Sequence, residues 1–544
     1  MTAGRRARRA LLVGVSLLAI APAGAFGASG HHKPSPSPAI GWQTCDDNDA
    51  FDCATVQVPK DYDHRNSGTI DVAVTRLPAQ GERTGSLFVN FGGPGGDAVD
   101  TLHAIGQDLF ASLNQHFDIV GFDPRGTGRD SDAIDCHANQ ETEGVYSKPF
   151  MRPDMDARAY FLRVRNYVQQ CLSTNPGVFP YVATANVARD MDLVRRGLGD
   201  AKLNYLGFSY GTFLGATYAS LFPHRYRALV LDGPLDPNQY INKPEANLRE
   251  QTAAFERALQ RFFQACAAHQ DACLRFGGDD PHDAFDQLVD QLNANPLPGG
   301  PDDPRPVNGD DLDFALTSLM YAKQYWPIAA EMLATTAQGD GSYLRFIADT
   351  FYGWLGDDRY DPGTDRYFTL SASEQRYTHD LFHYFEAGDN SWGMFDHMWW
   401  NTGYVELNWG MWPVQARDAY YGPFHAAGDE TTVLVVDTTY DPATPYRGGL
   451  RLARQLGNAR VLTMRGDGHT AYGGNSPCID AAVDAYVNDL TVPAAGTSCR
   501  QEVPFATAAT ATAKAATGTS LRGFARTLRR QGPGVSPVVT GIGR

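Results

Sequence analysis

The stretch from Lys202 to Pro237, KLNYLGFSYGTFLGATYASLFPHRYRALVLDGPLDP, constrains the fold more than any other part of the 544-residue chain. An apolar run stops at Gly207 to Gly211 (GFSYG), a small-residue helical pattern follows, and a second apolar run closes the unit. A serine on a strained strand-to-helix corner needs glycine two residues away on either side, because helix and strand close together there. An ordinary glycine-rich turn would also fit GFSYG alone, but the flanking elements favour Ser209 as a nucleophile.

Composition and charge limit the possible class of protein. The apolar fraction of 43% and the aromatic fraction of 11% indicate a globular protein with a sizeable core. A chain of 544 residues exceeds one compact core, so we expect an enlarged domain or two domains. The net charge of −16 argues against a nucleic-acid partner. We expect a monomer.

The N-terminal residues predict export. Four arginines precede an apolar segment over residues 11–20, and Ala23-Gly24-Ala25 offers a small-residue cleavage site. The apolar segment is too short for a permanent membrane span. We therefore expect a signal peptide over residues 1–25, a flexible leader over residues 26–40, and a secreted, extracellular protein.

Eight cysteines, an even number in an exported chain, predict disulfides. The sequence permits about 105 pairings. We favour the local ones, namely Cys45–Cys53, Cys136–Cys171, Cys266–Cys273 and Cys478–Cys499. A metal site is the competing interpretation, but the chain has no CxxC pair and no HExxH motif, so we expect neither zinc nor another cofactor.

Strands alternate with helices on both sides of the GFSYG unit. Residues 54–79 predict a β-hairpin with its turn at His64 to Gly68. Strands over Ser86–Asn90 and Phe117–Phe122 each end in a glycine-rich turn, FGGPGG at residues 91–96 and DPRGTG at residues 123–128. This alternation indicates a mostly parallel α/β sheet with helices on both faces, and such sheets bind ligands at the carboxyl ends of their strands.

A long stretch without this alternation follows Pro237. Helical patterns cover residues 247–268, 311–319, 326–335 and 344–351, whereas residues 279–308 are rich in Asp, Pro and Gly. Aromatic residues crowd 391–412, where they line subsites or pack the insertion against the core. We expect a mainly helical cap over 237–428 that divides the sheet domain into residues 41–236 and 429–502. An independent domain of unrelated role is the alternative.

The sheet pattern resumes at Thr432 and carries two further candidate residues. Asp441 lies in the loop after the strand that begins there, and His469 follows the expected last strand, Arg460–Met464. A helix over Ile479–Leu490 should cover the sheet, and we interpret the Ala/Thr-rich residues 503–544 as a mobile tail. Its arginines could contact anionic wall polymers, although a solvated tail is the simpler interpretation.

These residues supply the parts of a serine hydrolase. A serine hydroxyl needs a base to take its proton, and a carboxylate must hold that base in the right tautomer. In a doubly wound hydrolase they occur in the order Ser, acid, His. We therefore assign Ser209, Asp441 and His469, with Asp437 and Asp467 as rivals for the acid.

The oxyanion of the tetrahedral intermediate needs two backbone N–H donors. We expect them from Tyr210 and from Gly93 in the FGGPGG loop, although that loop could also be only a tight turn. We expect Asp123 and Arg125 to brace this loop through a salt bridge.

Five motifs carry a resemblance to a known family: NFGGPGG, DPRGTGRDS, the segment around Ser209, DPATP and GDGHT. Together they resemble the secreted tripeptidyl aminopeptidases of actinobacteria, in the prolyl-aminopeptidase branch of the α/β-hydrolases. The resemblance extends from about Trp42 to Cys499 and includes the C-terminal region with Cys478. It implies an α/β-hydrolase fold with a helical cap, the triad Ser209, Asp441 and His469, and the release of tripeptides from peptide N-termini.

An aminopeptidase must bind a free α-ammonium group, which needs carboxylates or carbonyls in the cap. The candidates are Glu245, Glu250 and Glu406. Our leading hypothesis is a secreted serine exopeptidase that acts on peptide or protein N-termini. An exported carboxylesterase with the same triad and a wall-associated binding protein with a hydrolase-like fold are the alternatives.

Overall fold

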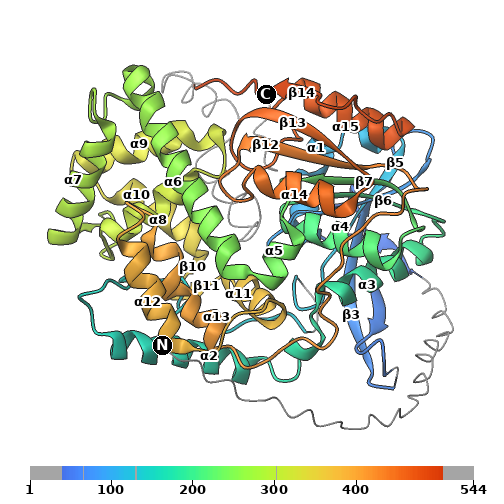
Figure 1. The fold of residues 1–544 in the computed structure, drawn as a ribbon, viewed down its shortest axis with the longest axis horizontal. Coiled ribbons are helices and arrows are strands. Elements are labelled where there is room, and N and C mark those ends of the chain that lie inside the picture. Colours follow the sequence, from blue (N-terminus) through green and yellow to red (C-terminus); the bar gives the residue numbers. More distant parts are fainter. Residues whose placement is uncertain (1–39, 65, 129–131, 302, 506–544) are drawn as a thin grey trace, which may run out of the picture. The chain divides into compact units, whose positions relative to one another are not determined.

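The computed structural model describes residues 40–505 except 65, 129–131 and 302. The expected signal peptide, most of the leader and all but the first residues of the expected tail lie outside the described residues. The described part belongs to one compact unit (Figure 1). In that part, no helix is long and apolar enough to span a bilayer.

A ten-stranded sheet forms the centre of the fold, in the order β1-β2-β3-β5-β4-β6-β7-β12-β13-β14. The strands from β5 to β14 in this order run parallel, whereas β1, β2, β3 and β5 pair in antiparallel fashion. Their bounds are β1 (Gln43–Thr44), β2 (Asp52–Pro59), β3 (Thr69–Leu77), β4 (Gly85–Asn90), β5 (Phe117–Phe122), β6 (Leu203–Phe208), β7 (Tyr226–Asp232), β12 (Val433–Tyr440), β13 (Ala459–Asp467) and β14 (Ser498–Arg500). The expected hairpin and parallel sheet are confirmed.

The central strands are buried on both sides, because helices cover both faces of the sheet. Alternate residues of each strand face opposite layers. Leu206 and Val230 pack against α1 (Val99–Leu109) and α15 (Pro477–Asp489), whereas Tyr205 and Leu229 pack against α3 (Thr184–Gly197), α4 (Tyr210–Leu221) and α14 (Arg447–Leu456). The chain therefore has the α/β-hydrolase fold that its motifs predict.

The chain between β7 and β12 forms helices, and we call this segment the helical insertion (residues 237–428). Its elements are α5 (Pro237–Asn242), α6 (Pro244–Ala268), α7 (Pro281–Ala294), α8 (Gly309–Leu319), α9 (Trp326–Ala337), α10 (Ser342–Tyr352), α11 (Gly363–Glu374), α12 (Leu381–Trp392), α13 (Leu407–Met411) and two small β-ribbons, β8 (Leu297–Pro298) with β9 (Pro306–Val307) and β10 (Trp354–Gly356) with β11 (Arg359–Tyr360). The four expected helical patterns correspond to α6, α8, α9 and α10. The Asp/Pro/Gly-rich stretch also contains a helix, α7.

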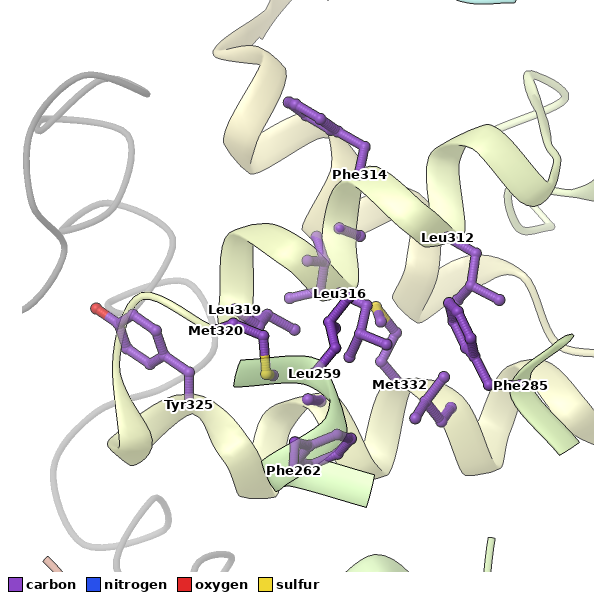
Figure 2. Close-up of a cluster of buried hydrophobic side chains, with 14 of the residues drawn as sticks. Leu259, Phe262, Phe285, Leu312, Phe314, Leu316, Leu319, Met320, Tyr325 and Met332 are labelled. Atoms are coloured by element: carbon purple, nitrogen blue, oxygen red, sulfur yellow. The ribbon is translucent and has the colours of Figure 1, made fainter. Parts of the chain in front are cut away.

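The helical insertion has its own hydrophobic core. Figure 2 shows Leu259 and Phe262 of α6, Phe285 of α7 and the apolar face of α8 meeting side chains of α9. A second cluster joins α11, α12 and α13 to α2 (Ala157–Thr174), which lies in sequence between β5 and β6. The helical layer is therefore built from two stretches of the chain, of which sequence analysis identified one.

The structure forms all four expected disulfides, Cys45–Cys53, Cys136–Cys171, Cys266–Cys273 and Cys478–Cys499. The expectation that Arg460–Met464 is the last strand was wrong, because β14 follows it and pairs in parallel with β13. The Cys478–Cys499 disulfide joins β14 to α15, so this short strand has a covalent anchor.

Candidate active site

Ser209 occupies the sharp turn between β6 and α4. Its backbone has φ 55° and ψ −123°, a conformation that L-residues rarely adopt outside strained turns. The neighbouring glycines make the turn possible. A Cβ atom on Gly207 would lie 2.5 Å from the carbonyl oxygen of Gly211, and one on Gly211 would lie 2.8 Å from Oδ1 of Asn90. The spacing Gly-x-Ser-x-Gly is therefore a packing requirement in this chain.

The FGGPGG loop lies directly against the serine. A Cβ atom on Gly92 would lie 2.8 Å from Cβ and 3.4 Å from Oγ of Ser209. Gly92, Gly93 and Gly95 have φ values of 104°, 110° and 98°, which favour glycine. The N–H of Gly92 donates to the side chain of Asn90, whereas Gly93 lines the cavity in front of the serine.

Asp441 and His469 form a buried pair after β12 and β13. Nδ1 of His469 lies 2.8 and 3.0 Å from the two carboxylate oxygens of Asp441, and both side chains have no exposed surface. Asp441 also accepts hydrogen bonds from the N–H groups of Ala443 and Thr444 and from the hydroxyl of Thr444. These donors fix the carboxylate, which in turn orients the imidazole ring.

The other nitrogen of the ring, Nε2 of His469, is buried and has no hydrogen-bond partner within the described residues. A Cβ atom on Gly233 would lie 2.9 Å from the adjacent carbon, Cε1. Gly233, which follows β7, therefore leaves the space in which the ring sits.

The two rival carboxylates have other environments. Asp467 forms ion pairs with Arg261 and Lys323 of the helical insertion. Asp437 is fully buried, and no described side chain donates a hydrogen bond to its carboxylate oxygens. Burial and the nearby charges of Asp441 and Asp232 raise the pKa of Asp437 well above its usual range.

A cavity opens in front of Ser209 between the strand ends and the helical insertion. Aromatic and polar uncharged side chains from both parts form its walls, and among the described residues that line it none is charged. The lining includes Gly93, Tyr146, Ser209, Gln251, Tyr321, Tyr367, Tyr377, Met398, Trp400, Asn401, Trp409 and Thr444. Of the crowded tryptophans, Trp400 and Trp409 line the cavity, whereas Trp399 and Trp412 are buried in the packing.

The three candidate carboxylates for the amine lie in different places. Glu250 pairs with Arg451, and Glu245 pairs with His383 at 2.7 Å. Glu406 is buried in the turn before α13, where Oε2 accepts from Gly403 N–H and the Thr402 hydroxyl. None of the three is among the residues that line the cavity.

Glu406 nevertheless lies directly behind the cavity wall. Its Oε1 is buried without a hydrogen-bond partner in the described chain. Burial raises the pKa of Glu406 to about 7. Burial also raises the pKa of the wall residues Tyr367 and Tyr377, and the charge of Glu406 adds to both shifts. Glu406 thus combines a raised pKa with an acceptor oxygen that has no partner among the described residues.

Of the two residues expected to brace the FGGPGG loop, only Asp123 bonds to the chain next to it. Asp123 accepts hydrogen bonds from the N–H groups of Ala98 and Val99, just after the FGGPGG loop. Arg125 is fully occupied elsewhere, with a two-pronged ion pair to Asp190 and bonds to three carbonyl groups. The expected salt bridge was wrong because Asp190, 65 residues further along the chain, is the nearer partner.

Comparisons with known proteins agree with this arrangement. The family described as alpha/beta hydrolase fold matches residues 88–306, and the family described as TAP-like protein matches residues 398–499. Serine protease Hip1 of Mycobacterium tuberculosis is 32% identical over 466 residues, which cover 82% of this chain and 87% of that protein.

Two other relatives carry names that denote different activities. Carboxylesterase B of Mycobacterium tuberculosis is 33% identical over 460 residues, with 82% of this chain and 86% of that protein covered. Tripeptidyl aminopeptidase of Streptomyces lividans is 31% identical over 466 residues, with 82% and 84% covered.

Proposed function

The chain belongs to the family of α/β-hydrolase-fold serine hydrolases that includes these three relatives, and from this premise we propose that it is a secreted exopeptidase that releases short peptides, of tripeptide length, from free N-termini. The observation that carries the proposal is the position of Ser209. It opens into a cavity whose far walls come from the helical insertion, and the same cavity is lined by Thr444, whose hydroxyl donates to the carboxylate of Asp441.

The proposed mechanism uses Ser209, His469 and Asp441 as a triad. Oγ of Ser209 attacks the scissile carbonyl carbon while Nε2 of His469 takes the hydroxyl proton. The charge that develops on the carbonyl oxygen is stabilised by the N–H groups of Tyr210 and Gly93. His469 then donates its proton to the leaving amine, the peptide departs, and water hydrolyses the acyl-enzyme by the reverse proton path.

Asp441 contributes by stabilising the protonated imidazole. Its carboxylate already accepts from Ala443, Thr444 and Nδ1 of His469, so the charge that appears on the ring meets a fixed anion. Because both residues are buried, the attraction between them is weakly screened by solvent.

We propose that the substrate ammonium binds where Tyr367, Tyr377 and Trp409 form the wall. Aromatic faces attract cations, and the carboxyl group of Glu406 lies behind this part of the wall with a free acceptor. A bound ammonium would favour the ionised form of Glu406, whose pKa of about 7 lies near neutral pH. Glu245 and Glu250 are less suited because each already has a cationic or histidine partner.

In this proposal the helical insertion acts as a cap that divides the hydrolase core into residues 41–236 and 429–502. A cap over the strand ends leaves room for only a few residues on the acyl side of the scissile bond. That restriction, together with an amine site in its wall, would convert a general acyl-transfer site into an exopeptidase.

Secretion is supported by the four disulfides, which form and persist in oxidising compartments. The signal-like N-terminal sequence, Arg5 to Ala25, agrees with this localisation.

An exported carboxylesterase is the second candidate, because one relative carries that name and the cavity lining is uncharged and largely aromatic. The two functions are separated by comparing three substrates: a tripeptidyl anilide with a free amine, its N-acetylated form, and a simple ester. We expect the free-amine anilide to be hydrolysed with a kcat/KM at least about 100-fold above that of the acetylated form, the factor that loss of a charge-assisted contact costs.

Equal cleavage of the acetylated anilide, or a clear preference for the ester, would contradict the exopeptidase. Ser209→Ala should lose several thousandfold in kcat on every substrate while keeping its circular dichroism spectrum. A binding protein without catalytic activity would hydrolyse none of the three substrates, and Ser209→Ala would then change nothing.

A further inference from the structure

Two histidines and an aspartate converge in the helical insertion. His282 and Asp286 lie one turn apart on α7, and His397 lies in the loop after α12. Nε2 of His282 lies 2.9 Å from Nε2 of His397, which in turn lies 3.5 Å from Oδ1 of Asp286. One nitrogen or oxygen from each residue lies within 4.8 Å of the other two. We call these three residues the His282 cluster.

The packing around the cluster holds these groups together. Residues four apart on a helix share a face, which places Asp286 beside His282. Phe285, between them in sequence, points into the insertion core (Figure 2) and its ring lies 5.0 Å from that of His397. Phe263 of α6 stacks on His282 at 5.3 Å. Apolar rings therefore surround the two imidazoles on the protein side.

We propose that the His282 cluster binds a divalent transition-metal ion, with Zn²⁺ as the ion that best fits its ligands. Imidazole nitrogen and carboxylate oxygen are ligands that Zn²⁺ takes at about 2.0–2.2 Å, and tetrahedral geometry then separates neighbouring ligand atoms by about 3.3 Å. The separations of 2.9 and 3.5 Å lie on either side of that value, and the third pair of ligand atoms, from His282 and Asp286, lies within 4.8 Å. Asp286 is half exposed, so water reaches the fourth position.

A hydrogen bond between the two imidazoles is the competing explanation for the short distance. It accounts for the contact between His282 and His397. It does not explain why the half-exposed carboxylate of Asp286, which could point into solvent, lies 3.5 Å from Nε2 of His397. The convergence of two imidazoles and a carboxylate on one point favours a metal ion.

The ion would join α7 to a segment that shapes the active-site cavity. His397 precedes Met398, which lines the cavity, and the N–H groups of both residues donate to Oε1 of Glu256 on α6. Bound metal would therefore restrict this loop and the wall that contains Met398 and Trp400. This consequence rests on the proposed function, whereas the binding site itself does not.

The test is metal binding by the full chain after dialysis against EDTA. We expect calorimetry to find one Zn²⁺ per chain, and Co²⁺ to give the intense visible absorption of a tetrahedral complex. At about 100-fold excess over the Kd, Zn²⁺ should raise Tm by about 2–3 °C. Activity enters none of these readouts, so failure of the exopeptidase proposal would leave them unchanged.

Three variants locate the site. His282→Gln and Asp286→Asn should each weaken Zn²⁺ binding at least about tenfold and abolish the Co²⁺ absorption. Both side chains are partly exposed, so these variants should fold even where the buried His397→Gln does not. The control His64→Gln removes an exposed histidine that is also paired with an aspartate, and it should bind as the original chain does.

The leader contains a second candidate pair, His31 and His32. If the His282 cluster is the site, the double variant His31→Gln/His32→Gln should still bind one Zn²⁺ per chain. The proposal is overturned if the chain binds no Zn²⁺ at one equivalent, if His282→Gln binds it as tightly as the original chain, or if the leader variant alone loses it.

Discussion

The carbonyl oxygen of Tyr321, in the helical insertion, accepts a 2.7 Å hydrogen bond from the backbone N–H of His469. The loop that carries the histidine is also tied to the insertion through Asp467, which pairs with Arg261 and Lys323. Tyr321 itself lines the cavity. The insertion therefore both forms the cavity wall and holds the candidate base in position.

Asp441 and Asp437 provide a matched pair of substitutions. We expect Asp441→Asn to lower kcat by about 10⁴, because the ring of His469 loses the anion that holds its tautomer. Asp437→Asn should change kcat less than about tenfold, because Nδ1 of His469 is held by Asp441 and no described side chain donates to the carboxylate of Asp437. Both are measured with the free-amine anilide and with thermal unfolding as the folding control. Similar losses in the two variants would refute the assignment of Asp441.

The glycines of the turn that carries Ser209 should not tolerate substitution by alanine. In Gly211→Ala the new Cβ would lie 2.8 and 2.9 Å from the side-chain and carbonyl oxygens of Asn90, so the turn or the FGGPGG loop must shift. A shift of this kind misplaces Ser209 and the oxyanion donors, and we expect kcat to fall at least about 100-fold. Gly428→Ala, which has no atom within 4 Å of the added Cβ, is the control and should be neutral.

Glu406 should give binding a specific pH dependence. A free-amine substrate needs an ionised Glu406, with a pKa of about 7, and a protonated N-terminus, with an ordinary pKa of about 8. Affinity should therefore peak between these values and fall on both sides. Calorimetry of the tripeptidyl anilide with the inactive Ser209→Ala chain measures this without turnover. Glu406→Gln should weaken binding at the optimum and remove the acidic limb.

The raised pKa of Glu406 also predicts how the stability of the chain depends on pH. The folded-state pKa of Glu406 lies above the ordinary value of 4.5, so its favourable contribution is complete below about pH 4.5 and is lost as pH rises through 7. Gln keeps an oxygen for Gly403 and Thr402 and never ionises. Glu406→Gln should thus raise Tm at pH 8 and leave it nearly unchanged at pH 4.5. A lower Tm at pH 8 would contradict this.

The disulfides should differ in their effect on the free energy of unfolding. Cys136–Cys171 closes a loop of sequence separation 35, and Cys45–Cys53 one of only 8. Loop-closure entropy then predicts about 4 and about 2.5 kcal/mol respectively. Paired Cys→Ala substitutions with urea unfolding measure both values, and a larger loss for the Cys45/Cys53 variant would contradict the loop-length argument.

Features set by short sequence spacing were predicted correctly. GFSYG between an apolar run and a small-residue helix specified the turn at Ser209, because only glycines fit the close approach of β6, α4 and Asn90. The order of Asp441 and His469 after successive strands placed them at one edge of the sheet. The parallel α/β architecture followed from the same alternation.

Features that depend on distant parts of the chain needed the tertiary structure. The helical layer includes α2, the strand order ends with β14, and Arg125 pairs with Asp190 rather than Asp123. The His282 cluster joins residues 115 positions apart and has no linear motif. Glu406 could be proposed from its aromatic neighbours, but its free acceptor behind the cavity wall could not.

The sequence by itself thus determined which residue is presented on the nucleophile turn, because a strained turn is a local steric problem with few solutions. Only the tertiary structure decided what surrounds Ser209: the uncharged cavity, the carboxyl group behind it and the bond from His469 to Tyr321. Those contacts join segments more than one hundred residues apart, and which of many compatible side chains meet there is settled by packing of the whole chain.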